Sequence, residues 1–90
     1  MDLGAPISYL TLSEGSPVFA QDGSELGKVA EVVAAPEQDI FEGLVVSSGL
    51  LGGGRHFVEA SRVASLHERG VVLGIEPEAF SALPERLGGA

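Results

Sequence analysis

The apolar segments between residues 16 and 75 are all short, and a turn signal follows each of them. These segments cover residues 16–20, 26–35, 41–48, 55–60, 63–68 and 71–75. Strand-length segments separated by Gly, Pro, Asp and Ser, with no helical pattern between them, are typical of an all-β domain. Five or six strands without intervening helices predict a small barrel or a sandwich.

Two local patterns refine this prediction. Asp22-Gly23 predicts a hairpin turn in which both residues adopt positive φ. In the segment 26–35, alternation that turns Val29 and Val33 toward the core would also bury Glu31, so we expect a bulge or bend near residues 30–32. The residues that we assign to structural turns are Asp22, Gly23, Gly27, Gly49, Gly52 and Gly54.

The two ends of the chain differ from the strand region. Residues 1–9 show no clear period and are interpreted as an N-terminal arm, residues 10–85 as the domain, and residues 86–90 as a flexible tail. Pro77 suits a first helical position, and apolar residues recur at helical spacing after it until Pro84. This pattern predicts a short helix from Pro77 to Leu83 that caps one end of the barrel.

Composition narrows the function classes. The 90 residues suffice for one domain, and without cysteine there is no disulfide or thiolate metal site. Thirteen acidic and five scattered basic residues give a net charge of −8, which would repel a polyanion, so we expect no direct nucleic-acid binding. No signal peptide or membrane span is predicted, and a cytoplasmic location is expected.

The stretch from Gly49 to His56 resembles a phosphate-binding loop. Gly49 and Gly54 have the spacing of its two glycines, but Arg55 and His56 stand where Lys and Ser or Thr would follow. The residues after the loop have strand character, so no helix dipole would point at a phosphate. A nucleotide-binding protein that uses this loop is therefore a disfavoured alternative.

Catalytic and metal patterns are not apparent in the sequence. His56 and His67 are the only imidazoles, and no carboxylate stands at a recognisable metal-ligand spacing from them. The dispersed acids are typical of a solvated surface rather than of paired catalytic carboxylates. We therefore predict a protein that is not an enzyme and has no catalytic, cofactor or metal site.

The order of the motifs resembles the PRC-barrel family, which includes the cytoplasmic domain of the photosynthetic reaction-centre H subunit. The C-terminal domain of a bacterial ribosome maturation factor is related. Gly27-Lys28-Val29 matches the family's Gly-Lys-Val, residues 49–54 match its glycine-rich loop, and Leu83-Pro84 matches its final helix. The resemblance covers about residues 10–85. Many members have Val-Pro where this chain has Val58-Glu59, so the resemblance does not predict the geometry of that strand's edge.

The resemblance implies a mainly β, six-strand small barrel with a short C-terminal helix and no catalytic activity. It also implies adaptor roles, such as docking on membrane complexes, ribosome assembly or cell division, and self-association as a homodimer or higher oligomer. Our leading hypothesis is a protein-binding adaptor with an unknown protein partner; the alternative is a ribosome-assembly or RNA-processing accessory factor. The candidate partner or dimer contacts are Leu50, Leu51, Arg55 and Phe57. Leu50 and Leu51 either plug the barrel or meet a partner.

Overall fold

The fold is taken from a computed structural model, which describes residues 2–48 and 54–85. Its strands are β1 (Pro17–Phe19), β2 (Glu25–Ala35), β3 (Ile40–Ser47), β4 (Arg55–Glu59), β5 (Val63–His67) and β6 (Gly70–Leu73). The helical elements are the 3-10 turns η1 (Tyr9–Thr11), η2 (Pro36–Gln38) and η3 (Ala60–Arg62) and the α-helix α1 (Pro77–Ser81). The expected mainly β fold with six strands and a short C-terminal helix is confirmed. The helix ends earlier than predicted, at Ser81 rather than Leu83.

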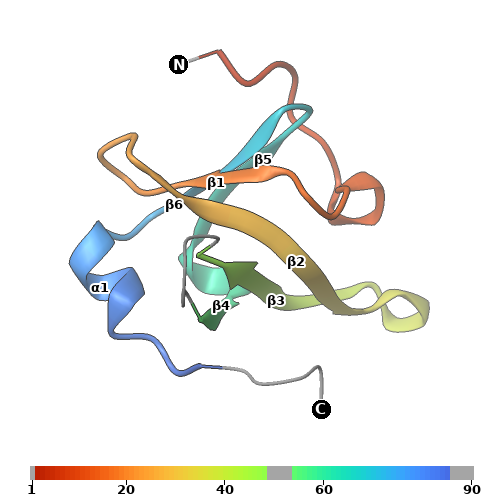
Figure 1. The fold of residues 1–90 in the computed structure, drawn as a ribbon. Coiled ribbons are helices and arrows are strands. Elements are labelled where there is room, and N and C mark those ends of the chain that lie inside the picture. The colour runs from red at the N-terminus through yellow and green to blue at the C-terminus, as the bar shows by residue number, and fades with distance from the viewer. Residues whose placement is uncertain (1, 49–53, 86–90) are drawn as a thin grey trace.

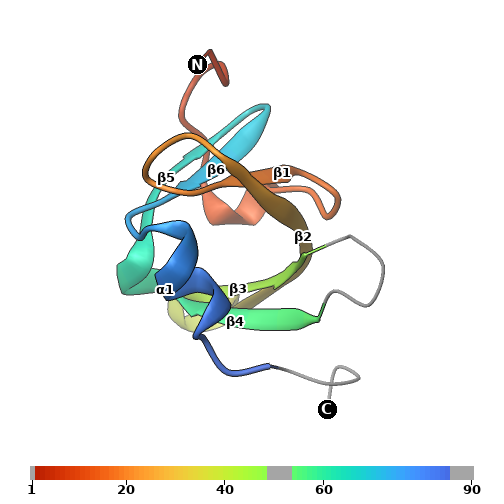
Figure 2. The same ribbon diagram turned by 60° about the vertical axis from the view of Figure 1, so that its left-hand side comes forward.

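All six strands belong to one sheet in the order β4-β3-β2-β1-β6-β5. Neighbouring strands are antiparallel except for β1 and β6, which are parallel. The sheet is curled: Figure 2 shows β1, β5 and β6 in one half and β3 and β4 in the other, with β2 running between them (Figures 1 and 2). Within the described residues β4 and β5 remain the two edges, so the barrel is not closed by hydrogen bonds.

The predicted bulge lies in β2 at Ala30. Val29 pairs with Val46 of β3 and Glu31 pairs with Val45, so Ala30 is the extra residue on the β2 side. Because the extra residue shifts the alternation of side chains, Val29 and Val32 both pack with the core. Glu31 pairs with Val45 and lies on the opposite face of the sheet. Because of this shift Val32, not Val33, has the inward position after Val29, as the expected bulge requires.

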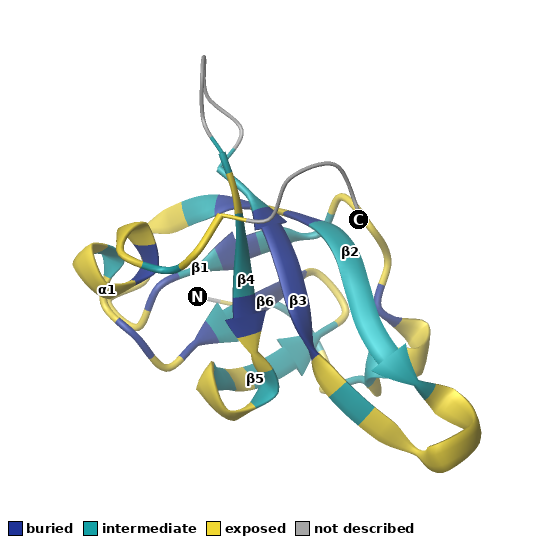
Figure 3. Cartoon of the chain, turned by 90° about the horizontal axis from the view of Figure 1, so that it is seen from below, coloured by how far each residue is buried: buried dark blue, intermediate teal, exposed yellow. Residues whose placement is uncertain are grey.

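The core fills the inside of the curled sheet. Its buried members are Leu12, Val18, Val29, Leu44, Val46, Val58, Val71, Leu73, Ile75 and Phe80. Phe80, which is 3% exposed, is the buried residue of α1 and brings the helix against the open end of the sheet. The middle of β3 is the most continuously buried strand segment, whereas the far end of the β2–β3 hairpin is exposed (Figure 3).

The hairpin between β1 and β2 is confirmed, but its turn differs from the prediction. Gly23 has a φ of 90°, whereas Asp22 does not have positive φ. The Gly23 N–H donates to the Ala20 carbonyl at 2.9 Å and the Ala20 N–H donates to the Ser24 carbonyl at 2.8 Å. The loop therefore has three residues and needs only one left-handed position, which glycine fills. The Asp22 carboxylate accepts from the Ser24 hydroxyl and N–H, and these bonds lower the pKa of Asp22.

Gly27 does not lie in a turn, which corrects its assignment. It is buried inside β2, where a Cβ would overlap the carbonyl oxygen of Ser47 on β3. Only glycine allows the two backbones to approach this closely. Its role is therefore to hold β2 against the end of β3.

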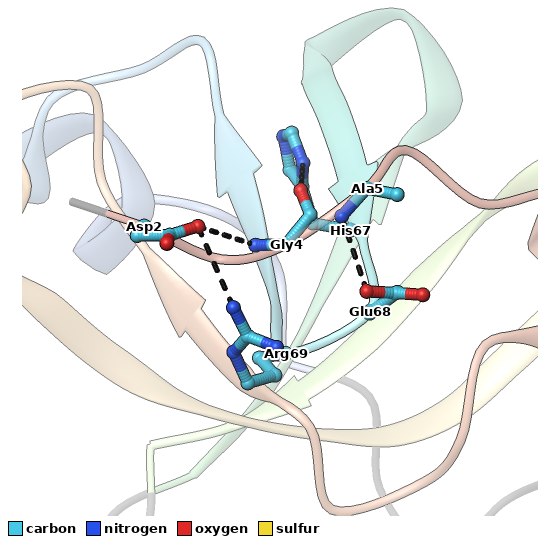
Figure 4. Close-up of polar contacts among 6 residues, drawn as sticks. All are labelled: Asp2, Gly4, Ala5, His67, Glu68 and Arg69. Atoms are coloured by element: carbon cyan, nitrogen blue, oxygen red, sulfur yellow. Dashed lines mark hydrogen bonds and ion pairs between the residues drawn. The ribbon is translucent and has the colours of Figure 1, made fainter.

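The N-terminal arm packs on β5 and β6 of the same chain. The Arg69 and Glu68 N–H groups donate to the Leu3 and Ala5 carbonyls at 2.8 and 3.0 Å, and the Ile7 N–H donates to the Leu66 carbonyl at 3.0 Å. Figure 4 shows side-chain contacts at the same place, including Glu68 accepting from the arm at 3.2 Å. The arm thus pairs with part of the exposed edge of β5.

The other edge of the sheet is partly covered by the chain after α1. The Phe57 N–H of β4 donates to the Pro84 carbonyl at 3.3 Å, and His56 forms a bridge with Glu85. Each edge strand is therefore paired in part with a terminal segment of its own chain, which removes much of the template for edge-to-edge association.

The contact at Gly27 yields a stability prediction. We expect Gly27→Ala to lower the free energy of unfolding by about 1–3 kcal/mol or more, because the new methyl group must push β2 and β3 apart. Gly74→Ala is the matched control, since a Cβ there would meet its nearest atom, the Arg62 carbonyl oxygen, at an ordinary 3.7 Å. Urea unfolding followed by circular dichroism measures both changes. Equal stability of the two variants would contradict the proposed close approach.

Candidate functional site

An open groove lies between η1 and the β2–β3 hairpin, and we call it the Tyr9 groove. Its lining residues are Tyr9, Leu10, Leu12, Glu14, Val32, Ala34 and Pro36. Its volume is about 300 Å³. Leu10 is 63% exposed, although Leu12 two residues later is buried in the core. The lining therefore includes both a core residue, Leu12, and an exposed aliphatic side chain, Leu10.

Local structure explains how η1 is placed beside the hairpin. Ser8 caps the 3-10 turn by accepting from the Leu10 N–H at 3.0 Å. The Tyr9 ring stacks on Phe41 of β3, with ring centroids 5.2 Å apart and an interplanar angle of 12°. Stacking of two aromatic rings at this distance contributes beyond the apolar area it buries. The arm is thus held at the hairpin by an aromatic contact across 32 residues of sequence.

The Tyr9 hydroxyl connects the groove to the acidic end of the hairpin. It donates to Asp39 Oδ1 at 3.2 Å. Asp39 ends η2 with a φ of 55°, a left-handed conformation that Asp tolerates better than most residues. Partial removal from water, and then the hydrogen bond and negative charge of Asp39, raise the pKa of Tyr9 above its ordinary value; Glu37 adds to this effect.

The glycine-rich loop can be compared with its prediction only in part. Gly49, Leu50, Leu51 and Gly52 lie outside the described residues. Gly54 is described, and its carbonyl accepts from both the N–H and the hydroxyl of Ser48 at 3.0 Å, which closes the connection from β3 to β4. A strand rather than a helix follows the loop, as the sequence predicts.

Arg55 and Phe57, the other candidate contacts, lie on the face of the sheet that points away from the core. Leu44 and Val46 belong to the core, so the residues between and beside them in β3 face outward. Pairing then places Arg55 beside Ser47 and Phe57 beside Val45 on this outer face. Arg55 is exposed and Phe57 is half-buried. The structure separates both from the Tyr9 groove, which lies on the inner side.

The two histidines make structural contacts at different ends of the sheet. His56 Nδ1 donates to the Leu83 carbonyl at 3.0 Å, and its ring packs on Phe80 with centroids 4.9 Å apart. His67 Nδ1 donates to the Gly4 carbonyl at 3.0 Å, as Figure 4 shows, and its Nε2 lies 2.9 Å from the Ser65 hydroxyl. Residues 2–48 and 54–85 contain no group of three or more His, Asp or Glu arranged to hold a metal ion.

The basic residues are dispersed over the fold. Lys28 is in β2, Arg55 in β4, Arg62 in η3, and Arg69 in the β5–β6 turn, while Arg86 lies outside the described residues. Arg69 pairs with Asp2 of the arm at 3.4 Å (Figure 4). No helix in the described part of the chain is long and apolar enough to cross a membrane.

The fold and this groove define a class of protein: a small β module built on one curled sheet, with an open groove beside its N-terminal arm. The family model for the PRC-barrel domain matches residues 7–76, and the chain therefore belongs to the PRC-barrel family. No curated protein matches the chain. The match begins at Ile7, so it includes η1 and the residues that line the Tyr9 groove.

Sequence reasoning missed the Tyr9 groove. Residues 1–9 show no clear period, so the sequence predicts an arm that ends at Tyr9 and no surface that Tyr9 and Leu10 build together. One signal was present: the only tyrosine of the chain is followed by an apolar residue within a segment too short to form a strand or helix of its own. Such a segment needs a partner element to bury its aromatic ring.

The single tyrosine makes the groove's electrostatics measurable. We expect absorbance titration of the tyrosinate to give a pKa for Tyr9 above its ordinary value, and Asp39→Asn to lower it, because the charge and the acceptor strength of residue 39 both fall. Because the pKa of Tyr9 is higher in the folded state, its contribution to stability is fully present at pH values below the unfolded-state pKa. This contribution is lost as the pH rises through the folded-state pKa. Glu78→Gln on α1 is the control. A midpoint that Asp39→Asn leaves unchanged would contradict the contact.

Proposed function

We propose that this PRC-barrel chain is a non-catalytic, cytoplasmic adaptor module that binds a partner protein at the Tyr9 groove and also self-associates. The observation that carries the proposal is Leu10, which is 63% exposed in a groove that Val32 and Ala34 also line. Exposed aliphatic side chains next to an apolar groove are typical of interaction surfaces. The net charge of −8 supports a protein partner rather than direct nucleic-acid binding.

The outer face of the sheet supports self-association. Strand pairing arranges its residues in rows: Lys28, Ser47 and Arg55 form the first, Glu31, Val45 and Phe57 the second, and Val33, Gly43 and Glu59 the third. Arg55 is therefore at one end of β4 and Glu59 at the other, with the half-buried Phe57 between them. A two-fold axis along the middle row would place Arg55 of each copy over Glu59 of the other.

A capture experiment tests the adaptor role. We expect Leu10→Ser to reduce retention of the natural partner by about tenfold or more, since one well-packed side chain can contribute about 1.4 kcal/mol to binding. Ile40→Ser is the matched control: Ile40 is also exposed, but alternation places it on the opposite side of the hairpin from Phe41. Quantitative mass spectrometry compares proteins retained from an extract of the source organism. Equal retention by Leu10→Ser and the unchanged protein would contradict the proposal.

Charge reversal tests self-association through the outer face. We expect a concentration-dependent dimer in sedimentation velocity, which Arg55→Glu and Glu59→Arg each weaken by placing like charges opposite each other. The double variant should restore the dimer, because it exchanges the two charges without changing their complementarity. Circular dichroism checks that each variant is folded. A protein that stays monomeric at high concentration, or a double variant that fails to restore association, would contradict this interface.

A further inference from the structure

The Tyr9 groove suits a small number of side chains rather than a large ligand. Its volume of about 300 Å³ is at the lower end of the range of about 300–1,000 Å³ that is typical of small-molecule pockets. Val32 and Ala34 supply half-buried apolar surface, and the exposed Leu10 extends it outward. One or two aliphatic side chains can cover this surface.

The charged residues of the groove's lining and of the adjoining turn η2 with its cap are acidic. Glu14 is part of the lining, and Glu37 and Asp39 belong to η2 and its C-terminal cap, directly after the lining residue Pro36. Neither Lys nor Arg is among the described residues that line the groove. All three carboxylates are on exposed residues, so an incoming cation can reach them without burial of an unpaired charge.

Charge complementarity selects among the occupants that could cover this surface. A second copy of the chain has only five basic residues, which are scattered in the sequence, so it offers no cluster of cations to the three carboxylates. An anionic membrane surface or a nucleic acid would be repelled in the same way. A protein segment that combines aliphatic and basic side chains matches both the aliphatic lining residues and the three nearby carboxylates.

We propose that the Tyr9 groove binds a short segment of a partner protein in which one or two aliphatic side chains are flanked by Lys or Arg. The aliphatic side chains pack on Val32, Ala34 and Leu10, and the flanking cations pair with Glu14 at one side and with Glu37 and Asp39 at the other. The rim cations raise the association rate and fix the direction of the segment more than they add affinity. This inference rests on the adaptor function proposed above and adds the chemistry of its partner.

Synthetic peptides test this partner chemistry. The first has two leucines flanked by lysines; the second has Glu in place of each Lys, and the third has Ser in place of each Leu. Each is titrated into the ¹⁵N-labelled full chain at low salt. We expect the Lys-Leu peptide to shift the amide resonances of Leu10, Val32 and Ala34 and to bind at least about tenfold more tightly than the other two. Comparable binding of the Glu-Leu or the Lys-Ser peptide, or shifts located on the outer face, would overturn the inference.

Two variants locate the charge effect. We expect Glu37→Gln to weaken binding of the Lys-Leu peptide by about two- to fivefold at low salt, with a smaller loss at high salt because exposed charges are screened. Glu78→Gln removes the same charge on α1, outside the groove, and should leave the affinity unchanged. Equal effects of the two substitutions would overturn the inference by showing that only the net charge matters.

The outcomes also separate this inference from the adaptor function. If Leu10→Ser abolishes capture of the natural partner but the Lys-Leu peptide does not bind, the adaptor function stands and the partner chemistry proposed here fails. If Leu10→Ser instead dissociates a dimer of the chain, the occupant is a second copy, and the inference is again overturned.

Discussion

The long strand β2 is the constraint on which the rest of the structure depends. It pairs with β1 on one side and β3 on the other, so both halves of the sheet are held by its backbone. The extra residue Ala30 bends it and changes which side chains face inward, and Gly27 lets it approach β3 closely. Without the extra residue, Glu31 would face the core. With a larger residue in place of Gly27, β3 would lie too far from β2 for the two strands to enclose the core.

A curled sheet that does not close has two edges, and this chain pairs part of each with its own terminal segments. The arm around Leu3, Ala5 and Ile7 hydrogen-bonds near β5, and the residues after α1 hydrogen-bond to β4. Covered edges disfavour association by strand addition. The association that we propose therefore uses side chains, on the outer face around Phe57 and in the Tyr9 groove.

The groove is a consequence of how the arm reaches β5. To pair with the edge strand and then enter β1, the chain passes the turn end of the β2–β3 hairpin, where Tyr9 stacks on Phe41. This path leaves Leu10 directed outward and brings the phenol to Asp39. One short 3-10 turn thus gives the small domain both an aromatic contact and an apolar surface with an acidic rim.

The sequence by itself determined the strands, the bulge near Ala30 and the short helix after Pro77, because each follows from local rules of alternation, charge burial and backbone conformation. It also carried the order of motifs that places the chain in its family. Tertiary structure decided that Gly27 serves close approach rather than a turn, and that Asp22 does not need positive φ. The Tyr9 groove also exists only in the tertiary structure, since it depends on contacts between segments that are far apart in the chain. Such contacts follow from the path of the folded backbone, and no local pattern encodes that path.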